Sequence, residues 1–242
     1  MSLRIGFDLD GVLADMESAL LRQAEGMFGA AATRTLHQPA REPPPSGDAP
    51  SDDAAETIPP LVKLDLTPGQ QRRLWRQVAS IENFWQSLEE IEAGIIARLA
   101  QLAGGRRWEI IFLTKRPQTQ GATAQVQSQR WLESKGFPLP SVYVVQGSRG
   151  RIASALSLDI VIDDRPENCL DVVVDSEARA VLIWRDDQEA LPAAARRLGI
   201  TIVPTVAECL DALSRLTPST RGGLSLLEQM KRLFGRKPTT DA

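Results

Sequence analysis

Two aspartates separated by one residue stand near the start of the chain, directly after a short apolar run. Asp8 and Asp10 flank Leu9, and Gly11 ends the run. Strand residues two apart point to the same face, and here the strand is ending, so both carboxylates can converge on one site. Such a pair can supply a nucleophile that carries a phosphoryl group as an aspartyl-phosphate, together with a general acid/base for the leaving group.

Polar and charged side chains also follow later apolar runs. A hydroxyl and two cations follow residues 110–113, two carboxylates follow 159–162, and an arginine-containing turn opens a helix between them. These residues are Thr114, Lys115, Arg116, Asp163, Asp164, Arg149 and Arg151. In an open α/β sheet, ligands bind outside the carboxyl ends of the strands. We therefore expect these side chains to meet Asp8 and Asp10 at one edge of a sheet.

The residue types in this set indicate a metal ion and a phosphate. Clustered carboxylates repel one another, so a divalent cation is their natural counterion. Because these motifs hold no His or Cys, the ligands are all oxygen, which suits Mg²⁺. Mg²⁺ usually completes its shell with water and phosphate oxygens, and a threonine hydroxyl with a cation would bind the remaining phosphate oxygens.

The composition excludes other classes of function. The formal charge of −3 argues against bulk electrostatic binding of a nucleic-acid polymer. A single histidine, His37, and two distant cysteines, Cys169 and Cys209, argue against His-based metal sites, Ser-His-Asp triads and a disulfide framework. The absence of an 18-residue apolar run or a signal peptide predicts a cytoplasmic protein that is not a membrane partner. We expect a small phosphorylated substrate and leave a homodimer open.

Strands and helices must alternate along the chain to position these residues. Apolar runs predict strands, and 3.6-residue periodicity predicts helices. The strands are expected at 3–9, 108–113, 142–145, 159–162, 180–184 and 201–203, and the helices at 16–28, from 67 onward, 91–102, 121–135, 149–158, 188–198 and 205–216. This alternation, with strands that are apolar on both sides, predicts an α/β fold with a doubly wound parallel sheet.

Helix boundaries are marked by capping residues and glycines. Thr67, Pro68 and Gln70 form a helix start, with a capping hydroxyl, a proline in the first turn and Gln three residues on. The helix at 91–102 is expected to stop at Gly104 and Gly105. Pro166 is expected to open a further helix after the acidic pair.

The chain divides into a core and an insertion. We predict a core of residues 1–15 and 101–216, and a small helical cap over 16–100 after the first strand. Within the cap, residues 38–60 are rich in proline and small polar residues, which predicts a mobile insertion. The tail, 217–242, is expected to hold a short basic amphipathic helix that packs on the body.

The segment from Phe7 to Val12 resembles the first motif of the haloacid dehalogenase superfamily of phosphotransferases. Thr114 after an apolar strand resembles the second motif, and Asp163 with Asp164 resembles the acidic fourth. The finer resemblance is to the 5′(3′)-deoxyribonucleotidase-like branch and covers about residues 3–30 and 80–185. The segments that carry it are 83–88, 112–117, 131–132 and 162–168.

This resemblance implies a role for each matching residue. Asp8 would be the nucleophile and a metal ligand, and Asp10 the general acid/base, with its backbone carbonyl on the metal. Thr114 would hold the phosphate. Asp163 would bind Mg²⁺ directly, and Asp164 would bind through water or from outside the first shell.

One position departs from the family pattern. The third motif usually holds a lysine that neutralises the nucleophile and the phosphate, and Arg149 stands there instead. Arginine keeps the charge but is larger, planar and bidentate, so the change is not conservative. Arg151 is a second candidate, and Lys115 can supply the charge from the opposite loop. We expect phosphate binding by Thr114, Lys115 and Arg149.

The function expected from these residues is Mg²⁺-dependent hydrolysis of a phosphomonoester, with a nucleoside monophosphate as the first substrate to test. Phe84 and Trp85 are candidates for lining the substrate, with the core of the cap as the alternative. A phosphate- or nucleotide-binding module without turnover is the rival function, because of Arg149. A phosphoacceptor switch like a response-regulator receiver is a third, against which the Asp8–Asp10 spacing and the inserted cap argue.

Overall fold

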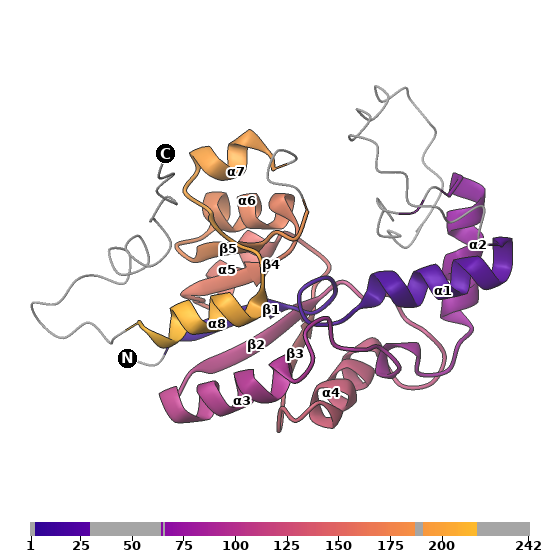
Figure 1. Ribbon diagram of the computed structural model, residues 1–242, viewed down its shortest axis with the longest axis horizontal. Helices are drawn as coiled ribbons and strands as arrows, with labels where there is room; N and C mark the ends of the chain where they lie inside the picture. Colours follow the sequence, from indigo (N-terminus) through magenta and orange to yellow (C-terminus); the bar gives the residue numbers. More distant parts are fainter. Residues whose placement is uncertain (1–2, 30–63, 65, 187–190, 217–242) are drawn as a thin grey trace, which may run out of the picture.

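A computed structural model describes residues 3–29, 64, 66–186 and 191–216. Its centre is a six-stranded parallel sheet of order β3-β2-β1-β4-β5-β6 (Figure 1). The strands are β1 Arg4–Asp8, β2 Glu109–Thr114, β3 Ser141–Val144, β4 Ile160–Asp163, β5 Arg179–Ile183 and β6 Thr201–Val203. The α/β fold with a doubly wound parallel sheet, predicted from the alternating pattern, is therefore confirmed.

The strand order places a switch point beside β1. The chain runs from β1 to β2 on one side and later returns to β4 on the other. Asp8 is in register with Leu113 of β2, and Phe7 is in register with Ile162 of β4. The last residues of these three strands therefore lie level at the carboxyl edge, which is where ligands bind in such sheets.

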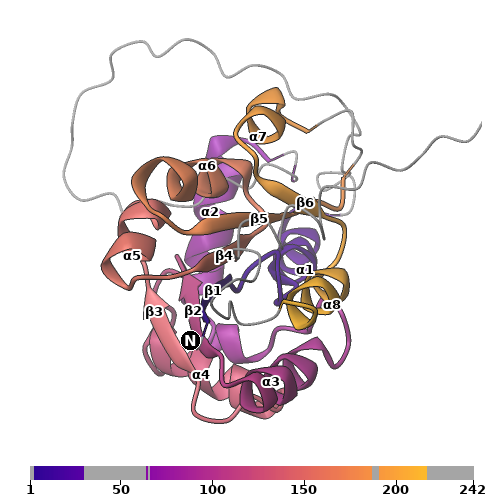
Figure 2. The ribbon, with the colours of Figure 1, turned by 90° about the vertical axis from the view of Figure 1, so that its left-hand side faces the viewer.

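Helices cover both faces of the sheet (Figure 2). They are α1 Met16–Phe28, α2 Pro68–Ala79, the 3₁₀ helix η2 Phe84–Gln86, α3 Ile95–Arg106, α4 Ala124–Ser134, α5 Arg149–Ala155, α6 Pro166–Asp175, α7 Ala193–Arg197 and α8 Val206–Ser214. Helices α5, α6 and α7 cover one face, and α3, α4 and α8 cover the other.

Alternate strand residues supply two separate apolar cores, because strand side chains alternate between faces. Phe112 and Ile162 pack with the α3, α4 and α8 side. Leu113 and Val161 pack with the α5, α6 and α7 side. The same alternation sends Asp163 to the α5 and α6 side, and Thr114 to the α4 side.

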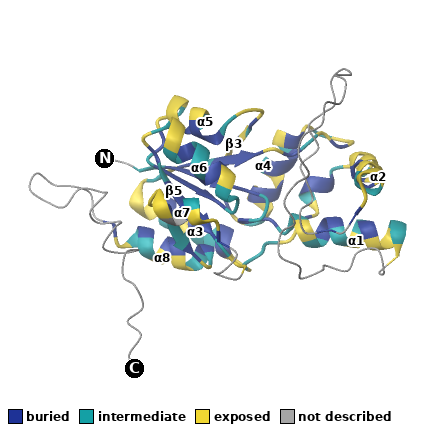
Figure 3. Cartoon of the chain, turned by 90° about the horizontal axis from the view of Figure 1, so that it is seen from above, coloured by how far each residue is buried: buried dark blue, intermediate teal, exposed yellow. Residues whose placement is uncertain are grey.

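Between β1 and β2 the chain leaves the sheet and forms the elements expected of a cap. Helices α1 and α2 lie beside each other and project from the sheet (Figures 1 and 3). Asp15 caps α1 by accepting from the Ser18 backbone N–H at 3.0 Å. Thr67 and Gln70 form the reciprocal capping box at the start of α2, as predicted.

The prediction for α3 was wrong at both ends. The helix begins at Ile95 rather than Ile91, and it continues through Gly104 and Gly105. Gly94 (φ +75°) and Arg107 (φ +57°) take the left-handed conformation on either side of the helix and set its ends.

The proposed boundary between core and cap at residue 100 falls inside α3, which packs against α8. That division stays a prediction. The Pro-rich stretch 38–60, His37 and the tail helix of 217–242 lie outside the described residues. Within the described residues, no helix is both long and apolar enough to span a membrane.

Candidate functional site

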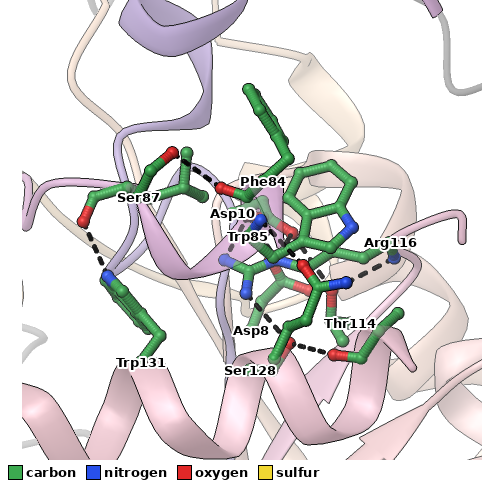
Figure 4. A network of polar contacts seen from close by, with 12 residues as sticks. Asp8, Asp10, Phe84, Trp85, Ser87, Thr114, Arg116, Ser128 and Trp131 are labelled. Carbon is green, nitrogen blue, oxygen red and sulfur yellow. Dashed lines mark hydrogen bonds and ion pairs between the residues drawn. The ribbon is translucent and has the colours of Figure 1, made fainter. Parts of the chain in front are cut away.

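The predicted acidic residues meet at the carboxyl edge of the sheet. Asp8 ends β1, Thr114 ends β2 and Asp163 ends β4. Asp10 lies in the turn after β1, where the Leu13 and Ala14 N–H groups both donate to the Leu9 carbonyl at 2.9 and 2.7 Å. This turn folds the chain back and holds Asp10 beside Thr114 (Figure 4).

Gly11 lets the fourth-motif acids approach this turn. Its φ of +86° is strained for any residue with a side chain, and an added Cβ would overlap the Asp164 carboxylate, with Cγ at 2.6 Å. The glycine that ends the first apolar run is therefore required both by the backbone and by the close approach of Asp164.

Arg149 lies between two of the carboxylates. Its Nη2 forms an ion pair with Asp8, and its Nε donates to Asp163 Oδ2 at 3.3 Å. Asp163 also accepts from the Asn168 side-chain amide at 3.0 Å and from the Arg165 backbone N–H at 2.9 Å. Asp163 is thus held from three sides, and Arg149 joins it to the predicted nucleophile.

The start of α5 places Arg149. Ser148 caps this helix and donates to Asp175 Oδ2 at 3.1 Å, which ties the cap to α6. A Cβ added at Gly150 would overlap the Asp171 carbonyl oxygen and come within 2.6 Å of Asp175 Cβ. Glycine at this position therefore lets α5 lie directly on α6 and brings Arg149 over the sheet edge.

More negative charge gathers here than one arginine balances. Burial raises the pKa of Asp8 well above its ordinary value, and Asp163 and Asp164 add to the rise while Arg149 opposes it. Burial and the charge of Asp163 raise the pKa of Asp164 to about 7. Burial lowers the pKa of Arg149, but the charges of Asp8 and Asp163 outweigh it, so the pKa is raised overall. The arrangement favours a further cation.

A second buried arginine, Arg116, binds Asp10. Its Nε donates to both carboxylate oxygens at 2.9 and 3.0 Å, and its Nη2 donates to Oδ1 at 2.7 Å. Its Nη1 donates to Ser128 Oγ at 2.9 Å, and its backbone N–H donates to Thr114 Oγ1 at 3.2 Å. Thr114 Oγ1 in turn donates to Asp10 Oδ2 at 3.0 Å, which closes the cluster in Figure 4.

Two tryptophans flank the Arg116 guanidinium. Its Cζ lies 5.1 Å from the Trp85 ring centre and 5.5 Å from that of Trp131. Each indole is fixed by its own N–H, which donates to Pro117 O at 2.9 Å from Trp85 and to Leu88 O at 2.7 Å from Trp131. These contacts add cation–π attraction to a desolvated charge.

The structure brings together most of the predicted site residues. Six of them meet at the sheet edge, namely Asp8, Asp10, Thr114, Arg149, Asp163 and Asp164. Lys115 and Arg151 are exposed. Trp85 is buried against Arg116, and Phe84 packs edge-on against Trp85 with ring centres 5.0 Å apart. A role for Lys115, Phe84 or Trp85 toward substrate stays a prediction.

Arg116 was expected at the sheet edge with the other cations, but no role in the site was predicted for it. The period of two in an extended segment could have found it, because residue 116 returns to the same side as Thr114 while Lys115 points away. Its burial depends on Trp85 and Trp131, which come from other parts of the chain.

The donors at the sheet edge match Mg²⁺ in kind. Asp164 Oδ1 is buried and has no hydrogen-bond partner in the described part of the chain, and the other candidate ligands are also carboxylates. Oxygen ligands of this type suit Mg²⁺. However, among residues 3–29, 64, 66–186 and 191–216, no group of three or more His, Cys, Asp or Glu side chains is already arranged as a metal site.

Three solved structures share this fold at low sequence identity. A hydrolase from Pseudomonas syringae matches with a TM-score of 0.51 and 14% identity, over 90% of this chain and 100% of its own. A HAD family hydrolase from Deinococcus radiodurans R1, with bound phosphate and sodium, matches with a TM-score of 0.50 and 15% identity over 90% and 99%. A phosphonoacetaldehyde hydrolase-like protein from Oleispira antarctica matches with a TM-score of 0.50 and 13% identity over 98% and 96%.

These likenesses show that the chain has the fold of haloacid dehalogenase (HAD) hydrolases. No protein-family model matches the sequence, and no curated protein matches it. None of the three structures is described as a nucleotidase. They support the superfamily fold and give no support to the 5′(3′)-deoxyribonucleotidase-like branch.

Proposed function

We propose that this chain hydrolyses phosphomonoesters through an aspartyl-phosphate on Asp8. The observation that carries the proposal is the placement of Asp8 beside Asp10 and Thr114, at the switch point of the sheet, with Arg149 on its carboxylate. A hydrolase of the same fold holds a bound phosphate, which agrees with a phosphate site in this fold.

In the first step a carboxylate oxygen of Asp8 attacks phosphorus, and the bond from phosphorus to the leaving oxygen breaks. Asp10 gives its proton to that oxygen. Thr114 and Arg149 bind the phosphoryl oxygens, where charge develops. In the second step Asp10 takes a proton from water, the water oxygen attacks phosphorus, and the bond to Asp8 breaks with release of phosphate.

We propose Mg²⁺ as the cofactor, held by Asp8, Asp163, Asp164 and the backbone carbonyl of Asp10. When bound, Mg²⁺ would neutralise charge on the phosphate and on the crowded carboxylates. The unpartnered Asp164 oxygen and the raised pKa of Asp8 support a cation here. We expect EDTA to abolish phosphate release and added Mg²⁺ to restore it. Full activity in EDTA would exclude the metal requirement.

Nucleoside monophosphates are the first substrates to test, because the segments at 83–88 and 162–168 resemble the deoxyribonucleotidase-like branch. A panel of phosphomonoesters should include deoxynucleoside monophosphates, sugar phosphates and p-nitrophenyl phosphate. Preference for a sugar phosphate would keep the phosphatase and reject the nucleotide substrate.

The test of the reaction is phosphate release by the wild-type chain beside Asp8→Asn. We expect release to fall by at least about 10³-fold in the variant, because an amide is no nucleophile for phosphorus. Arg130→Ala, on the exposed side of α4, is the matched control and should retain full activity. Full activity in Asp8→Asn would reject the mechanism. A stable phosphoaspartate formed from a small phosphodonor would favour the receiver-like switch instead.

A second candidate is a binding module for phosphate or nucleotide without turnover. The observation that favours it is the pairing of Arg149 with both Asp8 and Asp163, the nucleophile and a proposed metal ligand. It predicts phosphate binding without release, and Arg149→Lys should then raise hydrolysis. No gain in Arg149→Lys would count against this explanation.

A further inference from the structure

We infer that Arg116 is a positioning residue that acts on the reaction through Asp10. This inference rests on the proposed function, since it concerns the acid/base of that reaction. It gives the two buried arginines of the site different roles. Arg149 faces the nucleophile, and Arg116 orients the acid/base.

The guanidinium of Arg116 is hydrogen-bonded at each nitrogen by the described residues. Nε and Nη2 donate to Asp10, and Nη1 donates to Ser128. Its Cζ lies over the rings of Trp85 and Trp131, and its side chain is 0% exposed. A guanidinium bound in this way reaches a substrate only through the carboxylate that it holds.

The orientation of Asp10 is set at both of its oxygens. Oδ1 accepts from Arg116 Nη2 and Nε, and Oδ2 accepts from Arg116 Nε and Thr114 Oγ1. The Asp10 side chain is 12% exposed, so it borders the site while its partner is enclosed. An acid/base must be placed within hydrogen-bond reach of the reacting oxygen, and these contacts hold the Asp10 carboxylate in place. In that form it takes the proton from water in the second step and then gives it to the leaving oxygen of the next substrate.

Trp85 and Trp131 orient the Arg116 guanidinium on the Asp10 carboxylate. Trp85 comes from η2 in the inserted segment, and its backbone N–H donates to Gln127 Oε1 of α4 at 3.0 Å. Trp131 and Ser128 both lie on α4. The planar guanidinium lies over two rings and along one carboxylate. A lysine ammonium is a point charge without that plane, so lysine would keep the charge and lose the orientation.

The test compares two substrates that differ in their need for an acid. An alkyl phosphate has a strongly basic leaving oxygen that must be protonated, whereas p-nitrophenolate leaves without a proton. We would measure kcat/KM for both in wild type, Arg116→Lys and Asp10→Asn. We expect Arg116→Lys to lose at least about tenfold more kcat/KM on the alkyl phosphate than on p-nitrophenyl phosphate, part of the 10²–10⁴-fold that general acids supply.

Asp10→Asn should show the same substrate dependence in larger measure, because it removes the acid itself. The inhibition constant of inorganic phosphate should change by less than about twofold in Arg116→Lys, since a residue that acts through Asp10 leaves ground-state phosphate contacts in place. Equal losses on both substrates, or weaker phosphate binding, would overturn the inference and make Arg116 a structural or phosphate-binding residue.

Arg116→Ala with added guanidinium ion, at concentrations below those that unfold the chain, provides a second readout. We expect guanidinium to restore kcat/KM on the alkyl phosphate and urea not to restore it, because only the cation can bind against the two rings and pair with Asp10. The control Arg130→Ala should not respond. No restoration, in a variant that unfolds cooperatively, would contradict the inference.

Failure of the proposed function gives a different result from failure of this inference. If wild type releases phosphate from neither substrate, the phosphatase proposal is rejected and the inference falls with it. If wild type is active and loses nothing selectively in Arg116→Lys, only the inference is rejected.

Discussion

The site has two halves, one beside α4 and one beside α5, and each buries an arginine against an aspartate. Arg116 pairs with Asp10 on the α4 side, and Arg149 pairs with Asp8 on the α5 side. The halves differ in whether every guanidinium nitrogen has a hydrogen-bond partner. On the α4 side, every guanidinium nitrogen of Arg116 has a protein partner. On the α5 side, Nη1 of Arg149 is buried without a hydrogen-bond partner among the described residues. A buried donor without a partner costs free energy, so the α5 side favours a ligand that supplies an acceptor.

The balance of positive and negative charge also differs between the two halves, and again the α5 side is the incomplete one. Arg116 pairs with Asp10, whereas Arg149 lies among Asp8, Asp163 and the nearby Asp164. The α4 side is therefore neutral and complete, and the α5 side is acidic and incomplete. Under the proposed function, the α4 side would hold the acid/base in place and the α5 side would take a cation and a phosphate.

Removing the charge of each arginine tests the difference between the two halves most strongly. In EDTA, we expect Arg149→Met to lower the free energy of unfolding by about 3–5 kcal/mol, because it leaves two buried carboxylates without their cation. Arg116→Met should cost less, about 1–3 kcal/mol, because Asp10 borders solvent. Urea unfolding of both variants measures the difference. Equal losses would mean that the two halves are energetically alike.

Arg130→Met is the matched control, since an exposed arginine should change the free energy of unfolding by less than about 0.5 kcal/mol. Adding Asp8→Asn to Arg149→Met should recover part of the loss, because it removes one of the charges left unpaired. If the two changes simply add, Arg149 does not stabilise the chain through Asp8.

A substitution at Gly150 has a smaller effect and tests how the packing of α5 places Arg149. In Gly150→Ala, the added Cβ meets the Asp171 carbonyl and Asp175 Cβ, so α5 must move away from α6. We expect a loss of about 1–3 kcal/mol in unfolding free energy, typical of overpacking, with a fall in phosphate release as Arg149 moves. Gly147→Ala is the control, because nothing lies within 4 Å of its added Cβ. Equal effects at the two glycines would show that the contact between α5 and α6 does not place Arg149.

Much of the fold could be read from the sequence because its local signals agree with its tertiary structure. The capping box at Thr67 and the apolar runs that became β1 and β2 depend on neighbouring residues alone. The end of α3 depends on Arg107 taking a left-handed conformation after two glycines, which no propensity scale favours. A local cap sets that boundary, in which the Arg107 N–H donates to Ala103 O and Gly104 O. Because a residue with a side chain rarely takes this conformation, the boundary was not predicted.

The acidic half of the site was predictable in the same way, as were Asp10 and Thr114 on the α4 side, but the role of Arg116 was not. Asp8 and Asp163 stand at strand ends, so their meeting follows from sheet topology. Arg116 becomes buried only because Trp85 and Trp131, from other elements, close around it. The period of two places Arg116 on the side of Thr114 and its exposed neighbour Lys115 on the other. That pattern does not show that two tryptophans bury Arg116, because this burial arises from packing between distant segments.

The smallest test concerns the last contact that completes the α4 side. Ser128→Ala removes the acceptor of Arg116 Nη1 but leaves the three hydrogen bonds from Arg116 to Asp10 available. Because the Ser128 hydroxyl also donates to Ala124 O, alanine fits the helix and the loss should be about 1 kcal/mol in unfolding free energy. Ser134→Ala, whose hydroxyl likewise donates within α4, is the control for losing a helix hydroxyl. A loss no larger than that of Ser134→Ala would show that Arg116 is held without this partner, and the α4 side would then keep a donor free, as the α5 side does.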